Sequence, residues 1–163
     1  FTDCLLQRGA AEVVAVDVGH GQLHERLRAD PRVVNIERQN IRSVSPELIG
    51  GPVDGVVGDL SFISLRLVIA PLVSVCQPGA FMVLLVKPQF EAGRAEVSRG
   101  RGVVTDPTVH QRVRDEVAAA LRDHGCEVIA WTTSPITGAD GNVEFLVHAT
   151  TPSIDPLPSG GTA

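Results

Sequence analysis

Residues 83–94 read VLLVKPQFEAGR, and this stretch indicates which class of fold the chain adopts. Four apolar residues run directly into Lys87, and a proline follows at once. A short apolar run with β-branched residues is typical of a strand that is buried on both faces of an α/β sheet. Ligands in open α/β sheets bind outside the carboxyl ends of the strands. The charge at the end of this strand is therefore either a solvated boundary or part of a functional edge at Lys87.

Working outward from this strand, apolar runs alternate with helical segments along the chain. The last helix has an apolar stripe at helical spacing, and Asp106 followed by Pro107 is a typical helix start. The alternation predicts an α/β fold with a doubly wound, mostly parallel sheet, whose last two strands pair antiparallel because only a short link joins them. We expect strands at 12–18, 32–36, 53–61, 80–86, 127–133 and 142–150, helices at 2–8, 22–30, 64–76 and 107–124, and a loop at 88–105.

The 163 residues suffice for one domain, which we expect to span residues 1–150. Residues 151–163 are rich in turn-forming residues, so we expect a disordered tail. Phe1 stands directly before the first helical run, and no G-x-G-x-x-G motif occurs. We therefore expect the first strand of the sheet and its glycine-rich cofactor loop to precede Phe1.

Composition excludes several classes of protein. Cys4, Cys76 and Cys126 form no Cys-x-x-Cys pair, which fits a reducing cytoplasm better than a disulfide framework. His20 and His24 lack an accompanying Glu or Cys pattern, so we predict no metal site. No apolar run approaches the roughly 20 residues of a membrane-spanning helix, and no signal peptide is recognisable. The net charge of −5 means that nucleic-acid binding would require a local basic patch or residues outside this chain.

Several charged residues are predicted to share one edge of the sheet. Asp17, Asp59 and Lys87 each lie at the carboxyl end of a predicted strand, and Glu144 lies near the beginning of the antiparallel one. They are either solvated strand ends or a functional rim. An acidic residue at the position of Asp17 can accept both ribose hydroxyls of a cofactor, which fits NAD as well as S-adenosylmethionine.

Two further features lie beside this rim. Arg94, Arg99 and Arg101 fall in one segment after Lys87, and they are either a solvated loop or a group of phosphate contacts. Phe62 follows Asp59 closely, and it is either a core residue or a wall for a flat base.

Six motifs together resemble the TlyA-type (hemolysin A-like) RNA 2′-O-methyltransferases, which are relatives of the FtsJ-type RNA ribose methyltransferases. They are AVDVGHGQLHERLRADPRV, ERQNIR, VVGDLSFISL, LLVKPQFEAGR, GVVTDP and GNVEFL, and the resemblance spans residues 1 to about 150. It implies a Rossmann-like fold that binds S-adenosylmethionine, with an antiparallel last strand. It also implies methylation of cytidine riboses in ribosomal RNA or ribosomal subunits, and an N-terminal RNA-binding domain outside this chain.

The resemblance implies a Lys-Asp-Lys-Glu catalytic set, of which the first Lys would precede Phe1. Lys87 would act either as a base or as a group that orients the ribose hydroxyl, and the sequence leaves both open. Carried over motif by motif, this set makes Asp59, Lys87 and Glu144 catalytic. The expected cofactor-binding residues are Asp17, Asn40, Asp59 and Phe62. Independently of the resemblance, we expect Arg94, Arg99 and Arg101 to bind RNA.

Other functions compete with this interpretation. A non-catalytic Rossmann-like module that binds RNA or a partner is favoured by the missing glycine loop and disfavoured by the intact Asp, Lys and Glu. A cytolytic role is disfavoured because no strongly amphipathic basic helix occurs. An NAD-dependent oxidoreductase is disfavoured because the dinucleotide fingerprint is missing.

Overall fold

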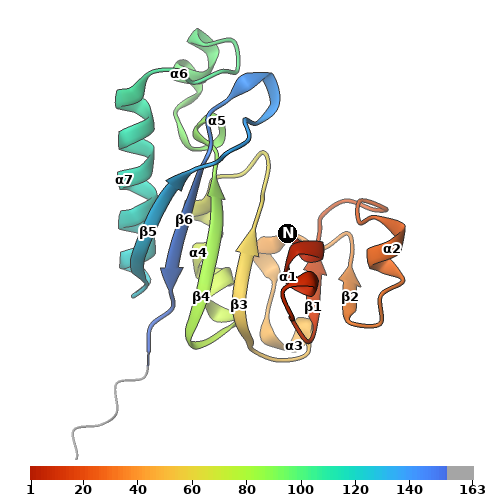
Figure 1. Ribbon diagram of the computed structural model, residues 1–163. Coiled ribbons are helices and arrows are strands. Elements are labelled where there is room, and N and C mark those ends of the chain that lie inside the picture. Colours follow the sequence, from red (N-terminus) through yellow and green to blue (C-terminus); the bar gives the residue numbers. More distant parts are fainter. Residues whose placement is uncertain (154–163) are drawn as a thin grey trace, which may run out of the picture.

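The computed structural model describes residues 1–153, apart from the side chains of Arg94, Ala95, Arg99 and Ala139. It contains two sheets that lie side by side, with helices on their faces (Figure 1). One sheet pairs β1 with β2, and the other has the strand order β3-β4-β6-β5. The prediction of a mostly parallel α/β fold with an antiparallel last strand is confirmed.

The elements follow one another in chain order and alternate in type over most of the chain. They are α1 (Thr2–Gln7), β1 (Val13–Val16), α2 (Glu25–Arg28), β2 (Val33–Ile36), the 3₁₀ turn η1 (Ile41–Ser43), α3 (Pro46–Ile49), β3 (Val53–Gly58), η2 (Leu65–Leu67), α4 (Ile69–Ser74), β4 (Cys76–Val86), α5 (Pro88–Glu91), α6 (Arg94–Arg99), α7 (Pro107–Asp123), β5 (Glu127–Thr133), η3 (Ala139–Gly141) and β6 (Phe145–Thr150).

The register of the four-stranded sheet fixes which strand ends meet. β3 runs parallel to β4 with Val56 opposite Met82, whereas β6 runs antiparallel to β4 with Phe145 opposite Val86. β5 pairs antiparallel with β6. The carboxyl ends of β3 and β4 and the amino end of β6 therefore share one edge.

The two-stranded sheet has the same direction as its neighbour. β1 and β2 are parallel, with Val13 opposite Val33 and Val16 opposite Ile36. The chain enters α1 at the edge toward which β1 and β3 point, descends along α1, and returns through β1 (Figure 1). The carboxyl end of β1 consequently faces the same way as those of β3 and β4.

The core lies between the four-stranded sheet and α7. Val113, Val117 and Leu121 form the buried stripe of α7 that the spacing predicts, and they pack with strand residues such as Met82 and Leu84 in one fully buried cluster. The helix begins as predicted, because Asp106 Oδ1 accepts the Thr108 N–H at 2.8 Å.

Between residues 64 and 86 the prediction is wrong in two places. The expected helix at 64–76 is divided into η2 and α4, with Val68 at φ −124° between them. Pro71 lies in the first turn of α4, where its missing N–H costs nothing, so it does not bend the helix. β4 begins at Cys76 rather than residue 80, because Cys76 already pairs with Val53 and a register shift follows.

The expected loop at 88–105 is also wrong, because α5 and α6 lie within it. Pro88 occupies the first position of α5, where a fixed φ favours a helical turn. Elements of four to six residues are too short to show a hydrophobic period, so composition alone conceals them. For the same reason α3 was not predicted. The helix expected at 22–30 is present only as the shorter α2.

The end of the described chain is ordered beyond the predicted boundary. Thr151 is buried, its hydroxyl accepts the Ala80 N–H at 2.9 Å, and the same hydroxyl donates to the Gln77 carbonyl at 2.8 Å. The prediction of a tail starting at residue 151 is therefore wrong for Thr151. Residues 154–163 lie outside the described residues.

Candidate active site

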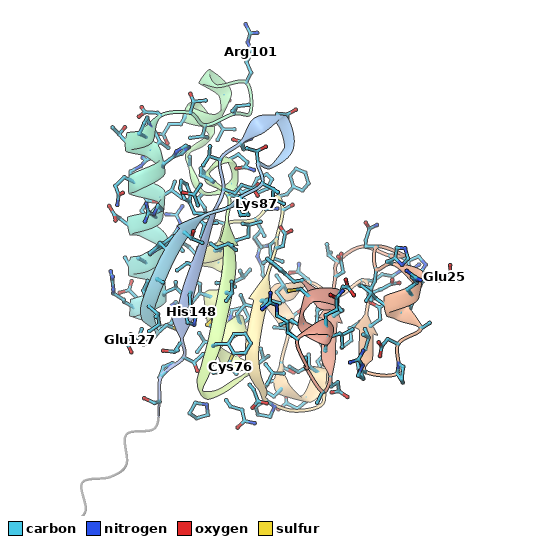
Figure 2. All side chains as sticks on the ribbon, viewed as in Figure 1. Glu25, Cys76, Lys87, Arg101, Glu127 and His148 are labelled. Carbon is cyan, nitrogen blue, oxygen red and sulfur yellow. The ribbon has the colours of Figure 1, made fainter. Side chains whose placement is uncertain are left out.

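Lys87 and Asp59 meet at the carboxyl edge of the four-stranded sheet. Lys87 Nζ lies 2.6 Å from Asp59 Oδ1 and donates to Ser61 Oγ at 3.1 Å. The Lys87 side chain is only 11% exposed, whereas that of Asp59 is 53% exposed. Lys87 directly follows β4, and α5 then turns the chain away (Figure 2). The less exposed ammonium group is therefore held against a carboxylate that faces solvent.

Glu144 lies at the same edge, one residue before β6. The pairing of Val86 with Phe145 brings Glu144 next to Lys87 in the ladder. The Glu144 residue is buried, and its Oε1 accepts a hydrogen bond from Gln89 Nε2 at 3.0 Å. The structure thus brings the three predicted catalytic residues to one rim, with Lys87 paired to Asp59 and Glu144 held by Gln89.

Phe62 is an exposed residue and does not belong to the core. It is 91% exposed and adopts a positive φ of 62°, a conformation uncommon for residues other than glycine. Its ring lies 5.1 Å from that of Phe90, centroid to centroid, and Lys87 Nζ lies 5.9 Å from the Phe90 centroid. The two phenyl rings form a small apolar surface next to the ammonium group.

Asp17 and Asn40 lie in the segments that follow the two strands of the smaller sheet. Asp17 directly follows β1, is exposed, and accepts the Gly19 N–H at 2.6 Å. Asn40 caps η1 by accepting the Arg42 N–H at 3.0 Å. Asp17 therefore lies at the carboxyl end of β1, whereas Asn40 lies in the connection that follows β2.

A cavity of about 530 Å³ lies between β1 and β3. Its walls include β1 on one side and β3 on the other, together with the apolar side chains of Ile41 and Leu60. Asp59 lies in its lining, so the cavity reaches the edge that carries Lys87. Most of its lining is apolar and comes from β1, β3 and the segments that adjoin them.

The predicted RNA-binding arginines fall in and after α6. Arg101 is exposed, has φ 52°, and projects outward from the molecule above Lys87 (Figure 2). Arg94 and Arg99 begin and end α6, but their side chains lie outside the described residues.

Several polar residues that hold this rim together were not predicted from the sequence. The signal was present in residues 87–91, where Lys, Gln and Glu alternate with Pro and Phe. Lys87 and Glu91 both contact the segment that follows β3, whereas Gln89 contacts Glu144. The missed residues are Ser61, Ser64, Gln89, Glu91 and Asn142, of which Asn142 joins the segments around residues 104 and 142 by accepting the Val104 N–H.

His20 and His24 both have partners within the protein. The His24 ring accepts the Arg26 N–H as the cap of α2, and the His20 ring pairs with Glu37. Hydrogen bonds from Asn35 and from the Gly21 N–H lower the pKa of the Glu37 carboxyl. Among residues 1–153 no three His, Cys, Asp or Glu side chains are grouped as metal ligands would be. Within that same range, every helix is too short or too polar to cross a bilayer.

The chain belongs to the FtsJ-like methyltransferase family, which matches residues 1–151. Its curated relatives include the 16S/23S rRNA (cytidine-2′-O)-methyltransferase TlyA of Mycobacterium tuberculosis, which is 51% identical over 90% of this chain. Hemolysin A of Brachyspira hyodysenteriae is 41% identical over 91% of this chain. The alignment covers 54% of the TlyA relative and 62% of hemolysin A, so the chain spans little more than half the length of these curated relatives.

Solved structures agree with this assignment. A candidate hemolysin from Lactococcus lactis superposes with a TM-score of 0.88 and 43% identity, covering 92% of this chain and 72% of that one. N-methyltransferase NodS from Bradyrhizobium japonicum, solved with S-adenosyl-L-homocysteine, superposes with a TM-score of 0.58 at 16% identity, covering 87% of this chain and 67% of that one. The second likeness concerns the fold alone.

Proposed function

We propose that this chain is the methyl-transferring domain of an RNA ribose 2′-O-methyltransferase that uses S-adenosylmethionine. The observation that carries the proposal is the pair of Lys87 Nζ and Asp59 Oδ1, 2.6 Å apart at the edge that also holds Glu144. Membership of the FtsJ-like methyltransferase family supports it. The name of the mycobacterial relative favours ribosomal RNA cytidine as the target, and such a substrate favours a cytoplasmic location.

Lys87 is the residue that meets the ribose 2′-hydroxyl. An ammonium group has three N–H donors, of which Lys87 directs one to Asp59 and one to Ser61. The third donates to the 2′-oxygen and holds it in line for transfer. Because the Asp59 carboxylate stabilises the charged lysine, we assign Lys87 the orienting role. Positioning of this kind accounts for a large part of the acceleration in reactions between two bound groups.

The proton of the 2′-hydroxyl must leave as the oxygen gains the methyl carbon. Asp59 is half-exposed and negatively charged, so it is the group at this rim that can receive the proton and pass it to water. Glu144 is buried and accepts a hydrogen bond from Gln89. We assign it two roles: it anchors the α5 turn, and its negative charge contributes to the electrostatic potential around the ribose.

The residues present fit S-adenosylmethionine, which supplies an electrophilic methyl group when it is bound. Asp17 offers a carboxylate at the end of β1 to the ribose hydroxyls of the cofactor. Asn40 and the neighbouring Ile41 offer a polar and an apolar contact to the adenine. Phe62 stands beside Asp59 as a wall for a flat base.

We also propose that residues 1–150 form a domain completed by a further strand between β1 and β3. Within the described residues, β1 pairs with β2 and β3 with β4, and their facing edges line the 530 Å³ cavity. An exposed strand edge is a template for another strand. The longer curated relatives have chain to supply one, since this chain covers 54% of the mycobacterial relative.

Calorimetric titration with S-adenosylmethionine tests this completion. We expect residues 1–163 alone to bind little cofactor and the longer natural polypeptide that carries them to bind it. The glycine-rich loop that such a strand would supply permits close backbone approach to the cofactor. Tight binding by residues 1–163 alone would contradict the proposal.

The function is tested by incubating that natural polypeptide with tritiated S-adenosylmethionine and ribosomal subunits. Digestion of the RNA to nucleosides should yield 2′-O-methylcytidine, and a Lys87→Ala control should yield none above background. A methyl group on a base would refute ribose methylation. RNA binding without any methyl transfer would instead support the non-catalytic module.

A further inference from the structure

We propose that Glu91 is a positioning residue that sets the distance between Asp59 and Lys87 from behind the active rim. This inference rests on the proposed function. Glu91 neither faces the cavity nor belongs to the predicted catalytic set, and its side chain is only 2% exposed. Its carboxylate joins the two segments that carry the ion pair.

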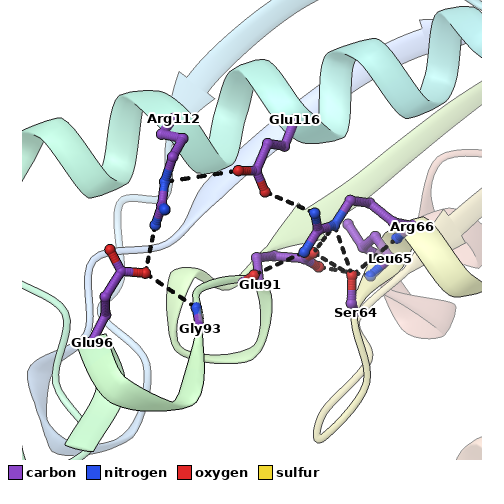
Figure 3. Close-up of polar contacts among 8 residues, drawn as sticks. All are labelled: Ser64, Leu65, Arg66, Glu91, Gly93, Glu96, Arg112 and Glu116. Carbon is purple, nitrogen blue, oxygen red and sulfur yellow. Dashed lines mark hydrogen bonds and ion pairs between the residues drawn. The ribbon is translucent and has the colours of Figure 1, made fainter.

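Both carboxylate oxygens of Glu91 bind the segment that follows Asp59. Oε1 accepts the Leu65 N–H at 2.6 Å, and Oε2 accepts the Ser64 hydroxyl at 2.5 Å (Figure 3). Ser64 and Leu65 form the start of η2, so the carboxylate caps this turn across a sequence separation of 26 or 27 residues. Hydrogen bonds this short, between a neutral donor and a charged carboxylate, are among the strong ones in proteins.

Arg66 closes the connection from the other direction. Its Nη2 donates to the Glu91 carbonyl at 3.0 Å, and its Nε lies 3.5 Å from Glu91 Oε2. Arg66 also pairs with Glu116 on α7 at 2.8 Å (Figure 3). The guanidinium of Arg66 is 40% exposed, so Glu91 is the buried member of the network and Glu116 is an outer one.

The position of Glu91 is transmitted to Lys87 through a single helical turn. The Glu91 N–H donates to the Lys87 carbonyl at 3.2 Å, and the Phe90 N–H donates to the same carbonyl at 2.9 Å. Fixing Glu91 therefore fixes the backbone from which the Lys87 side chain extends.

Two connections thus join the same pair of segments. At the front, Lys87 contacts Asp59 and Ser61, and at the rear Glu91 contacts Ser64 and Leu65. If the Lys87 side chain were fixed only through its ammonium group, it would move whenever the exposed Asp59 carboxylate moved. The rear connection turns both segments into one rigid support, which is what a reaction sensitive to placement requires.

A buried carboxylate is a costly way to hold a loop in place. Removing a carboxylate from water is unfavourable, and apolar residues of similar volume often stabilise a fold at least as well. A bidentate carboxylate, however, fixes the direction and length of its contacts, which apolar packing does not. We infer that Glu91 contributes geometry at the rim more than stability.

The test uses Glu91→Gln in the natural polypeptide that carries this chain. The glutamine carbonyl still accepts the Leu65 N–H, but its NH₂ group faces the Ser64 hydroxyl and cannot accept from it. We expect the single-turnover methylation rate at saturating RNA and cofactor to fall about 10- to 100-fold, because a displacement of about 1 Å costs on that order. The Kd for S-adenosylmethionine and the KM for RNA should stay nearly unchanged.

A second readout does not depend on methylation. Acylation of Lys87 by a water-soluble active ester, followed by mass spectrometry, reports how firmly Asp59 and the support hold the amine. Glu91→Gln should speed labelling of Lys87 relative to that of the wild type. If the wild type proves unable to methylate RNA, the proposed function fails and this readout still decides the role of Glu91.

Two controls separate positioning from loss of stability. Leu121→Ala weakens the core far from the rim and should lower the melting temperature while leaving Lys87 labelling and the rate at 25 °C unchanged. Glu116→Gln breaks the outer pair with Arg66 and should leave both readouts at the wild-type level. Unaltered rate and labelling in Glu91→Gln, or changes no larger than those of Leu121→Ala, would overturn the proposal.

Discussion

The four-stranded sheet and the two-stranded sheet of this molecule differ in how they are stabilised. The main buried cluster draws all its members from positions 65–149, and several of them are completely inaccessible. In β1 all four residues are only half-buried, and in β2 Val34 is 42% exposed. One sheet has a core of its own within the described chain, whereas the other is less buried and borders a cavity beside its neighbour.

This difference has a functional meaning, because the two sheets carry different parts of the proposed site. Asp59, Lys87 and Glu144 are fixed by the four-stranded sheet, which supports the acceptor side of the reaction. Asp17 and Asn40 depend on the two-stranded sheet, which supports the cofactor side. The acceptor side is prearranged by packing, and the cofactor side depends on what fills the cavity.

Lys87→Ala in the natural polypeptide is the most severe test of this difference between the two sheets. We expect methylation to fall by about 10²- to 10⁴-fold, the range typical of removing a positioned polar catalyst. Cofactor affinity should be almost unchanged, because Asp17 and Asn40 follow the strands of the other sheet. Tritium incorporation and calorimetry measure the two quantities. Near-normal turnover would reduce Lys87 to a strand-end charge.

The unequal packing is tested by two truncations of apolar side chains. Leu121→Ala removes a fully buried side chain from α7 and should lower the free energy of unfolding by about 2–5 kcal/mol. Val34→Ala in β2 should cost less than about 1 kcal/mol, because Val34 is 42% exposed. Urea denaturation followed by circular dichroism measures both. Equal losses would show that the two sheets form one cooperative core.

A smaller effect is expected for Asp17→Ala on the cofactor side. Hydrogen bonds to a charged group are worth about 1.5–3 kcal/mol, so the Kd for S-adenosylmethionine should rise about 10- to 100-fold. The rate at saturating cofactor should remain close to that of the wild type. A lower saturated rate with unchanged Kd would move Asp17 from the cofactor side to the acceptor side.

The smallest effect belongs to Arg101, which lies outside both sheets. Arg101→Ala should weaken RNA binding a few-fold and reduce the slope of log K against log salt by about one, as expected for one lost phosphate contact. Filter binding at several salt concentrations measures the slope, and Arg122→Ala on α7 is a matched surface control. An unchanged slope would show that Arg101 is merely solvated.

Long elements with a clear period were predictable from the sequence. The apolar stripe of Val113, Val117 and Leu121, together with the Asp106 cap, predicted α7. Short apolar runs predicted the six strands. Short elements such as α5 and α6 were not predictable, because one or two helical turns without a period resemble a loop.

The sequence by itself determined the class of fold, the family and the edge on which Asp59, Lys87 and Glu144 lie. These follow from strand ends and motifs, which are local properties of the chain. Only the tertiary structure decided the partners of those residues. Glu91 meets Ser64 across 27 residues and Gln89 meets Glu144 across 55, and nothing in a linear spacing predicts which polar side chains become neighbours after packing. The position of the cavity between β1 and β3 is likewise a property of the packed sheets, because it arises from two edges that are distant in the chain.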